Sequence, residues 1–381
     1  MKIVRDIYLS LGTNQGNKLE NLQKALNLLA DSAGVISKIS TVYQTKSWGY
    51  ESNDFLNICV KCSSSMNPED FLLTIREIER EVGRKAKTSE TYEDRIIDID
   101  MLLFDREIIF SNELTVPHKS MLERNFVLVP LAEIAPHVQH PITKTSIQDC
   151  LKNCSDTAEV SAIESSLERP LAISEIYNYI AIEGNIGAGK TTLTKMMAND
   201  FNAKIVLERF ADNPFLPKFY EDNDRFAFPL EMSFLADRYR QLSDDLAQFD
   251  LFKNFIVSDY YIFKSLIFAQ VTLQKEEYLL YRRIFDIMYK EITKPELYIY
   301  LYQNTDRLLE NIKKRGRSYE QNIEATYLDK IHQGYSTFIK TEEQLNTLII
   351  DVSDKDFVNN PEDYKEIIQL IKKGVPSNLK N

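Results

Sequence analysis

The feature that most constrains the fold is a glycine-rich segment at residues 180–192, near the middle of the chain. A short apolar run precedes the glycines and a helix-forming stretch follows them, so the segment is predicted to join a strand to a helix. Such a turn is typical of a phosphate-binding loop (P-loop), because glycines let backbone N–H groups wrap around phosphate oxygens beside the positive end of a helix. The loop residues expected to contact a nucleotide are Gly184, Asn185, Gly187, Ala188, Gly189, Lys190, Thr191 and Thr192.

Two side chains supply the chemistry of this loop. Lys190 is long enough to reach the β- and γ-phosphates of ATP, and the Thr191 hydroxyl can ligate Mg²⁺. A P-loop normally follows the first strand of its domain, yet about 175 residues precede this one. Those residues therefore need a domain of their own.

Composition and charge limit the partners of the chain. Its 381 residues suffice for two or three domains, and its net charge of −11 argues against a general nucleic-acid or membrane-surface binder. We expect neither a signal peptide nor a membrane span. Four cysteines are few for a disulfide scaffold and suit the reducing cytoplasm. Cys59 and Cys62 have a zinc-like spacing, but in a strand they would point to opposite faces, so zinc is not expected.

The first 150 or so residues alternate between strand and helix patterns. The order strand–helix–strand–strand–helix–strand predicts an α+β fold with a ferredoxin-like sheet. Strands are predicted at 3–11, 35–45, 55–63 and 95–104, and helices at 19–29, 68–82 and 121–134.

Asp98 and Asp100 are two residues apart in a predicted strand, so their carboxylates face the same side. Adjacent like charges are unfavourable unless a cation lies between them, and Mg²⁺ prefers such oxygen ligands. A solvated strand face is the alternative. Basic residues nearby favour a phosphate site, since arginine matches phosphate oxygens. These residues are Arg84, Arg95, His118 and Arg124.

Residues 5 to about 150 resemble the 6-hydroxymethyl-7,8-dihydropterin pyrophosphokinases of folate biosynthesis. The resemblance implies transfer of pyrophosphate from ATP to the pterin hydroxymethyl group, with release of AMP. The matching segments, which together span nearly the whole of this part, are 10–14, 43–45, 55–57, 79–84, 94–100, 114–118 and 124–126.

The same resemblance implies roles for individual residues. Asp98 and Asp100 would hold two Mg²⁺ ions on ATP. Phe55 and Phe126 would sandwich the pterin ring. The polar edge of the pterin would contact Asn57 and the Thr45 backbone. The residues expected around the transferred phosphates are Arg84, Arg95, His118 and Arg124.

One loop departs from the family. The family carries Trp-Gly-Pro before its catalytic arginine, whereas this chain has Tyr92-Glu93-Asp94 in a loop about one residue longer. Lys85 and Lys87 stand where the family has arginines. We expect lid closure and ATP affinity to be the properties that these changes affect.

The middle of the chain separates two parts of different character. Residues 156–175 are polar and mixed, and they are predicted to form a linker, with room for a short helix. The predicted domains are therefore 1–155 and 176–381.

The second part alternates apolar strands with helices, which predicts an α/β fold with a five-stranded, doubly wound parallel sheet. Active-site residues should then lie at the carboxyl ends of the strands. The strands are predicted from Tyr177 into the P-loop and at 204–208, 255–259, 297–301 and 348–351.

Two further features fit such a sheet. Glu208 ends the second strand, where a carboxylate can accept a proton from a substrate hydroxyl; an ordinary exposed glutamate is the alternative. The basic run 313–317 is either a solvated face or a lid that closes over ATP.

Residues 177 to about 373 resemble the deoxyribonucleoside kinases, with close matches at 183–192, 208–216 and 315–320. The resemblance implies phosphorylation of a deoxynucleoside 5′-hydroxyl by ATP. It also implies homodimerisation through the kinase helices, an adenine-binding loop at 351–360 and, by analogy with bacterial relatives, purine substrates. The implied roles are a general base for Glu208, lid contacts for Arg315 and Arg317, sugar contacts for Tyr220 and Glu320, and base contacts for Glu231 and Arg238.

Two departures bear on activity. Glu231 stands where the family has a base-reading glutamine. The family's acidic–Arg–Ser motif is replaced by 258–261, which lacks the arginine; Asp259 can still serve a metal, and Lys264 can supply a charge. Two alternatives stay open for this part, a thymidylate-like nucleoside monophosphate kinase and a non-catalytic regulatory module. Glu208 and Tyr220 favour a nucleoside substrate.

Overall fold

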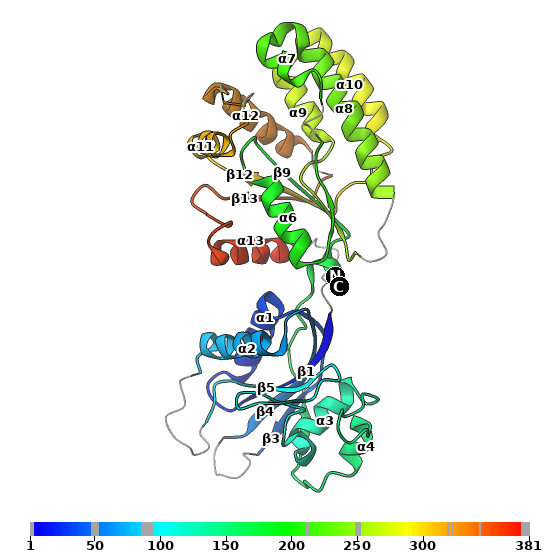
Figure 1. The fold of residues 1–381 in the computed structure, drawn as a ribbon, viewed down its shortest axis with the longest axis vertical. Coiled ribbons are helices and arrows are strands. Elements are labelled where there is room, and N and C mark those ends of the chain that lie inside the picture. Colours follow the sequence, from blue (N-terminus) through cyan, green and yellow to red (C-terminus); the bar gives the residue numbers. More distant parts are fainter. Residues whose placement is uncertain are drawn as a thin grey trace. The chain divides into compact units, whose positions relative to one another are not determined.

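The computed structural model describes residues 4–46, 53–84, 94–209, 213–247, 253–317, 320–321, 323–342 and 344–374, without the side chain of Tyr220. The chain forms two compact units, Met1–Ala172 and Ile173–Asn381. Each unit has its own sheet and its own buried cores (Figure 1).

The N-terminal unit is built on a six-stranded antiparallel sheet of order β5-β1-β4-β3-β8, with β2 also paired to β4. This order, with a helix after the first strand and after β4, is the predicted ferredoxin-like arrangement. Its elements are β1 (Arg5–Thr13), α1 (Lys18–Ser32), β2 (Val35–Ile39), β3 (Val42–Thr45), β4 (Phe55–Ser64), α2 (Pro68–Val82), β5 (Asp98–Phe104), β6 (Ile109–Phe110), β7 (Thr115–Val116), η1 (Met121–Glu123), α3 (Asn125–Ile134), α4 (Ile147–Lys152) and β8 (Ser161–Ile163).

Apolar cores cover both faces of this sheet (Figure 1). Helices α1 and α2 pack on one face through residues such as Leu26 and Phe71, and α3 and α4 pack on the other through residues such as Leu128. Cys62 belongs to the first core and Cys59 to the second. This confirms that the two cysteines point to opposite faces.

Two sequence predictions differ from this unit. The single strand predicted at 35–45 is interrupted, because the Ser40 hydroxyl takes the place of a ladder carbonyl and accepts the Cys59 N–H at 2.9 Å. The segment predicted as a linker is largely bound to the N-terminal unit: residues 161–163 form β8, which pairs with β3. This pairing covers backbone groups of β3 that an edge strand would leave open.

The C-terminal unit has a five-stranded parallel sheet of order β10-β11-β9-β12-β13, as predicted. The P-loop strand β9 lies at its centre. Its elements are α5 (Ile173–Ile176), β9 (Tyr179–Gly184), α6 (Lys190–Asp200), β10 (Lys204–Val206), α7 (Leu216–Glu221), α8 (Asn223–Ala247), β11 (Ile256–Ser258), α9 (Phe263–Thr272), α10 (Lys275–Tyr289), β12 (Leu297–Tyr302), α11 (Thr305–Arg315), α12 (Ala325–Thr341), β13 (Thr347–Asp351) and α13 (Pro361–Lys373).

Separate cores cover the two faces of the parallel sheet. Helices α5, α6 and α13 contribute to one core, whereas α8, α9 and α10 contribute to the other. Because the strands are parallel, their carboxyl ends meet at one edge, to which the P-loop belongs. Within the described part of the chain, no helix combines the length and the apolar character that a membrane crossing needs.

Candidate active sites

The paired aspartates lie at the start of β5, and basic residues from outside that strand reach one of them. Arg84 Nη1 is 2.8 Å from Asp98 Oδ1. Arg95 Nη1 pairs with Asp98 Oδ2. The structure thus brings three of the predicted site residues into direct contact around one carboxylate.

Glu79 is a member of this cluster that the sequence reasoning did not single out. It is the last buried residue of α2. Its carboxylate pairs with Arg84 and accepts the Ile99 N–H at 2.8 Å. A sequence signal was present, because Glu79 is four residues after Ile75 and so falls on the apolar face of the helix. A carboxylate at a core-facing position requires a partner.

The electrostatics around Asp100 fit a cation site. Burial and the neighbouring Asp98 raise the pKa of the Asp100 carboxyl to about 7, against the opposing effect of Arg124 and Arg95. Burial and Arg124 lower the pKa of His118, which favours its neutral imidazole. A divalent cation would relieve a desolvated pair of like charges, so the two carboxylates suit the expected Mg²⁺. No group of three or more His, Cys, Asp and Glu side chains that could hold a metal occurs among the described residues.

Three of the four residues predicted to bind the pterin lie on the neighbouring strands β3 and β4. Asn57 Nδ2 donates to Thr45 Oγ1 at 2.9 Å, and both side chains are buried. Thr45 is paired with Phe55 across the β3–β4 ladder. Phe126 lies at the start of α3, with the Arg124 guanidinium 5.6 Å from its ring centroid. The sandwich of the pterin between Phe55 and Phe126 stays a prediction.

Part of the predicted catalytic loop falls outside the described residues. This applies to 85–93, which contains Lys85, Lys87 and Tyr92.

In the kinase-like unit, the P-loop has the backbone that its glycines predict. Gly184, Gly187 and Gly189 all have positive φ angles, and Gly189, at +90°, begins helix α6. A Cβ atom on Gly189 would lie 2.8 Å from Phe357 Cζ, so glycine is required there for space as well as for conformation. Phe357 belongs to the segment predicted to hold adenine.

Lys190 and Thr191 link the loop to the rest of the site. Lys190 Nζ donates to the carbonyl oxygens of Gly184 (2.9 Å) and Asn185 (2.8 Å). Burial and the like charge of Lys264 lower the pKa of Lys190 to about 8. The Thr191 hydroxyl donates to Asp259 Oδ2 at 2.5 Å. A hydroxyl beside a carboxylate is an oxygen donor set that suits Mg²⁺.

Glu208 lies two residues after β10 and is held by cations. Arg238 approaches Oε1 with Nε at 2.8 Å and Nη2 at 2.7 Å, and Lys264 Nζ is 2.5 Å from Oε2. These two cations hold the pKa of Glu208 well below its usual range although the carboxylate is buried. The backbone N–H of Glu208 also donates to Asp259 Oδ1 at 2.7 Å. Asp259 therefore connects the predicted base, Glu208, to the P-loop threonine, Thr191.

Glu231 is buried on α8, and its carboxyl oxygen Oε1 accepts the Thr272 hydroxyl at 3.0 Å. Glu320 contacts both predicted lid arginines: Arg315 Nη2 pairs with Oε2, and Arg317 Nη1 is 3.2 Å from Oε1. The lid residues are thus brought together with the predicted sugar-binding carboxylate. Tyr220 lies in α7, and its side chain falls outside the described residues.

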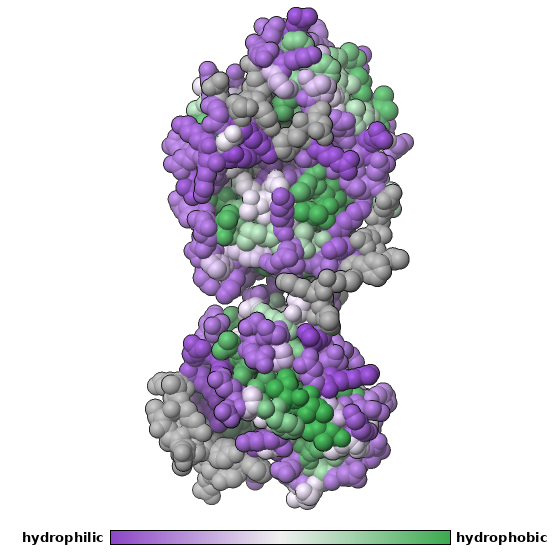
Figure 2. All heavy atoms as spheres, in the orientation of Figure 1, coloured by the Kyte–Doolittle hydropathy of each residue, from purple (hydrophilic) through white to green (hydrophobic). Residues whose placement is uncertain are grey.

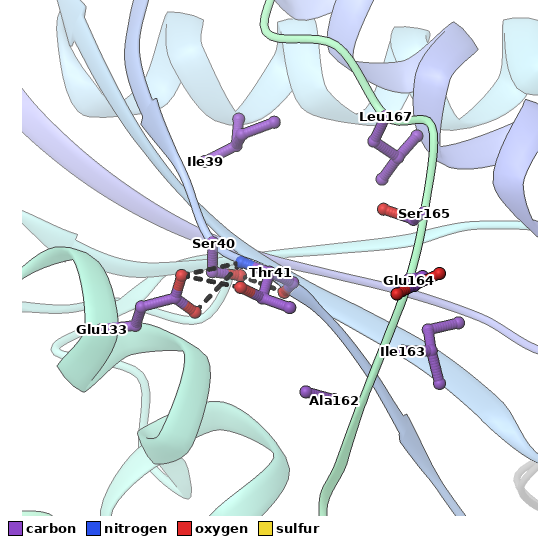
Figure 3. Close-up of a pocket in the computed structure, with 9 residues that line it drawn as sticks. All are labelled: Ile39, Ser40, Thr41, Glu133, Ala162, Ile163, Glu164, Ser165 and Leu167. Carbon is purple, nitrogen blue, oxygen red and sulfur yellow. Dashed lines mark hydrogen bonds between the residues drawn. The ribbon is translucent and has the colours of Figure 1, made fainter.

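A cavity of about 740 Å³ beside strands β3 and β8 has a different lining (Figure 3). Two glutamates, Glu164 and Glu133, line it. Glu133 accepts hydrogen bonds from the Thr41 N–H at 3.0 Å, the Thr41 hydroxyl at 2.9 Å and the Tyr43 hydroxyl at 3.1 Å. This carboxylate is satisfied, and none of the described lining residues is a predicted site residue. We therefore assign the cavity to neither reaction.

Comparisons with known proteins give a different family for each part of the chain. Residues 8–136 match the family model of 7,8-dihydro-6-hydroxymethylpterin-pyrophosphokinase, and residues 180–376 match that of deoxynucleoside kinase. A deoxyadenosine kinase from M. mycoides with bound dATP is a similar solved structure, with 24% sequence identity and a TM-score of 0.44; the match covers 50% of this chain and 97% of that one.

Curated relatives match each part over most of their own length. The deoxyguanosine kinase of Bacillus subtilis is 38% identical over 198 residues, which cover 51% of this chain and 96% of that protein. The 2-amino-4-hydroxy-6-hydroxymethyldihydropteridine pyrophosphokinase of Aquifex aeolicus is 41% identical over 144 residues, which cover 38% of this chain and 88% of that protein. The thymidylate-like and non-catalytic alternatives are not favoured by these matches. The chain belongs to both families, and it is a bifunctional enzyme in which a hydroxymethyldihydropterin pyrophosphokinase is joined to a deoxynucleoside kinase, each using ATP.

Proposed function

We propose that Asp98 and Asp100 hold Mg²⁺ on the phosphates of ATP, and that Arg84 and Arg95 stabilise negative charge on the pyrophosphoryl group during transfer. The observation that carries this assignment is the direct pairing of both arginines with Asp98, next to a second desolvated carboxyl group. When bound, Mg²⁺ would neutralise phosphate charge. His118 and Arg124 are the further phosphate contacts, and the lowered pKa of His118 makes its imidazole a neutral donor.

In this reaction the pterin hydroxymethyl oxygen attacks the β-phosphorus of ATP. The bond between that phosphorus and the α-phosphate oxygen breaks, and AMP leaves. The protein contributes mainly position and electrostatics. Thr45 and Asn57 would hold the polar edge of the pterin, while Phe55 and Phe126 would hold its faces.

In the kinase part, Glu208 acts as the general base that accepts the proton of the deoxynucleoside 5′-hydroxyl. Its contacts with Arg238 and Lys264 support this role, because they keep the carboxylate ionised and oriented. Lys190 holds the phosphates within the P-loop, and Thr191 would ligate Mg²⁺. Arg315 and Arg317 are the lid residues that would turn to the phosphates.

The nucleoside is a purine deoxynucleoside. The names of relatives support this class: Bacillus subtilis has a deoxyguanosine kinase that is 38% identical and a deoxyadenosine/deoxycytidine kinase that is 29% identical. Tyr220 and Glu320 would contact the sugar 3′-hydroxyl, and Glu231 would lie at the base, while Arg238 holds Glu208.

The kinase helices provide the surface for a homodimer. Leu279, Leu280 and Ile287 on α10 are at least half exposed. Apolar residues are visible along the edge of the molecule at α10 (Figure 2). Leu280 and Ile287 are seven residues apart, which puts them on one face of the helix. We place the enzyme in the cytoplasm without nucleic-acid or membrane partners, since its charge is negative and its four cysteines are free.

A substrate screen of the full chain tests these assignments. Hydroxymethyldihydropterin and each deoxynucleoside are offered singly with ATP and Mg²⁺, and AMP and deoxynucleoside monophosphates are quantified. We expect AMP with the pterin and monophosphates with the purines. Preference for pyrimidines, or dependence of neither reaction on Mg²⁺, would contradict the proposal.

A further inference from the structure

Glu231 is a buried carboxyl group with one oxygen satisfied and the other unsatisfied. Its side chain lies within α8 and the residue is 2% exposed. The Thr272 hydroxyl lies 3.0 Å from Oε1 and 2.9 Å from the Phe268 carbonyl oxygen, so its single proton is shared between two acceptors. Among the described residues, Oε2 is buried and has no hydrogen-bond partner. Because a buried polar atom is normally paired, we expect Oε2 to accept a hydrogen bond from a bound ligand.

The charged groups near Glu231 are engaged elsewhere. Arg238, on α8, directs Nε and Nη2 to Glu208 at 2.8 and 2.7 Å, and Lys264, on α9, lies 2.5 Å from the same carboxylate. Tyr281, on α10, donates to the backbone carbonyl of Glu231 at 3.4 Å. None of these described groups forms an ion pair with the Glu231 carboxyl group. When it is ionised, its oxygens are therefore available to accept hydrogen bonds from a ligand.

The position of Glu231 relative to Glu208 suits the far end of a nucleoside. Arg238, which holds Glu208, is seven residues after Glu231 on α8, and this separation corresponds to roughly 10 Å along the helix. A nucleoside spans a comparable distance between its 5′ oxygen and the pairing edge of its base. With the 5′-hydroxyl at Glu208, the base would extend toward Glu231. This step rests on the proposed function of the kinase part.

We propose that Glu231 selects guanine over adenine by accepting hydrogen bonds from the guanine N1–H and 2-amino groups. A carboxylate offers only acceptors, and the pairing edge of guanine offers these two adjacent donors. Adenine presents its N1 as an acceptor beside one amino donor. A carboxylate oxygen of ionised Glu231 would therefore repel the lone pair of the adenine N1. A glutamine, which has one acceptor and one donor group, matches adenine instead.

The protonation state of Glu231 gives a second and independent signature. Burial raises the pKa of Glu231 to about 7, against the opposing effects of Arg238, the Thr272 hydroxyl and Lys264, and with Glu208 reinforcing the rise. Above this pKa the side chain is a carboxylate and matches guanine. Below it the side chain is a carboxylic acid, with one donor and one acceptor, and matches adenine. The preference for deoxyguanosine should therefore increase as the pH rises through the pKa.

Internal competition in the full-length enzyme tests the proposal. Equal concentrations of deoxyguanosine and deoxyadenosine are offered together with ATP, and the ratio of dGMP to dAMP gives the ratio of the two kcat/KM values. Because both nucleosides share Glu208 and the P-loop, pH effects on catalysis cancel in this ratio. We expect wild-type enzyme to favour dGMP increasingly between about pH 6 and about pH 8.

Glu231→Gln should lower the ratio by about tenfold or more and remove its pH dependence, because one good bidentate contact gives discrimination of this size. Thr272→Val, which removes the hydroxyl next to Oε1, should lower the ratio by a smaller factor. Glu276→Gln, an exposed change of the same chemistry on α10, should leave both the ratio and its pH dependence unchanged. Deoxyinosine, which lacks the 2-amino group, should compete less well than deoxyguanosine against wild-type enzyme.

A ratio that is flat with pH and unchanged in Glu231→Gln, while both purines are phosphorylated, would overturn the inference and leave the proposed kinase function standing. Phosphorylation of neither purine by the wild-type enzyme would overturn the proposed function itself. If Glu231→Gln loses all activity, Thr272→Val decides: an unchanged ratio in that variant would also overturn the inference.

Discussion

The two halves of this enzyme offer phosphate-binding groups of different kinds. In the N-terminal unit the candidate site is a network of side chains, in which Arg84 and Arg95 converge on Asp98 from different segments. In the C-terminal unit it is a backbone loop, whose carbonyl oxygens accept the Lys190 ammonium group at 2.8 and 2.9 Å. Both halves use the same nucleotide, but the sheets that support them differ in strand direction and order.

The direction of the strands determines how each unit can assemble such a site. A parallel sheet brings strand ends and helix N-termini to one edge, so one contiguous loop provides the N–H groups and the helix dipole. An antiparallel sheet offers no such edge. We propose that charged side chains from β5 and from the segment between α2 and β5 provide the contacts instead. Buried Glu79 connects the helix to the strand.

The largest difference between the two reactions is expected when the kinase base is changed. Glu208→Gln removes the proton acceptor but keeps the shape of the side chain, so deoxynucleoside phosphorylation should fall by about 10²- to 10⁴-fold. Release of AMP with the pterin should be unchanged. Steady-state rates of both reactions in the same preparation check this, with exposed Glu276→Gln as the matched control. Kinase activity equal to that of the control would remove Glu208 as the base.

The counterpart in the N-terminal unit is Asp98→Ala. It should slow pyrophosphoryl transfer by about a hundredfold or more, on the order of 3 kcal/mol in the barrier, because it removes a proposed Mg²⁺ ligand and releases two arginines. The measurement is AMP formation with saturating pterin and Mg²⁺. Glu69→Ala, an exposed acidic change on α2, is the control and should retain full activity. AMP formation by Asp98→Ala at the wild-type rate would contradict the assignment.

A smaller effect is expected where Lys264 stands in for the arginine that the kinase family carries nearby. Lys264→Met removes one of the two cations that lower the pKa of Glu208, so that pKa should rise. Since a base works in its ionised form, the acidic limb of the kcat/KM profile should move to higher pH, while the rate near neutrality changes little because Arg238 still keeps the carboxylate ionised there. Lys275→Met, an exposed change, is the control. An unshifted acidic limb would show that Lys264 does not tune the base.

Local spacing explains which parts of these sites could be predicted from sequence. The P-loop is contiguous, and Asp98 and Asp100 share a strand face, so both followed from residue order alone. Strand and helix periodicity likewise predicted both sheets. The contact between Lys264 and Glu208 joins positions 56 residues apart, and its geometry depends on how α9 packs beside the end of β10. The pairing of β8 with β3 was missed for a related reason, because a three-residue strand has too few residues to show a period.

We propose that the chain has two independent ATP sites, one made by a backbone loop and one by side chains. The most direct test is Lys190→Ala in the full-length enzyme, with AMP from the pterin reaction and deoxynucleoside monophosphate measured on the same sample. We predict that monophosphate formation falls by about a hundredfold or more while AMP release keeps its wild-type rate. A parallel loss of both products in a folded variant would contradict the claim, because it would make the P-loop a part of both reactions.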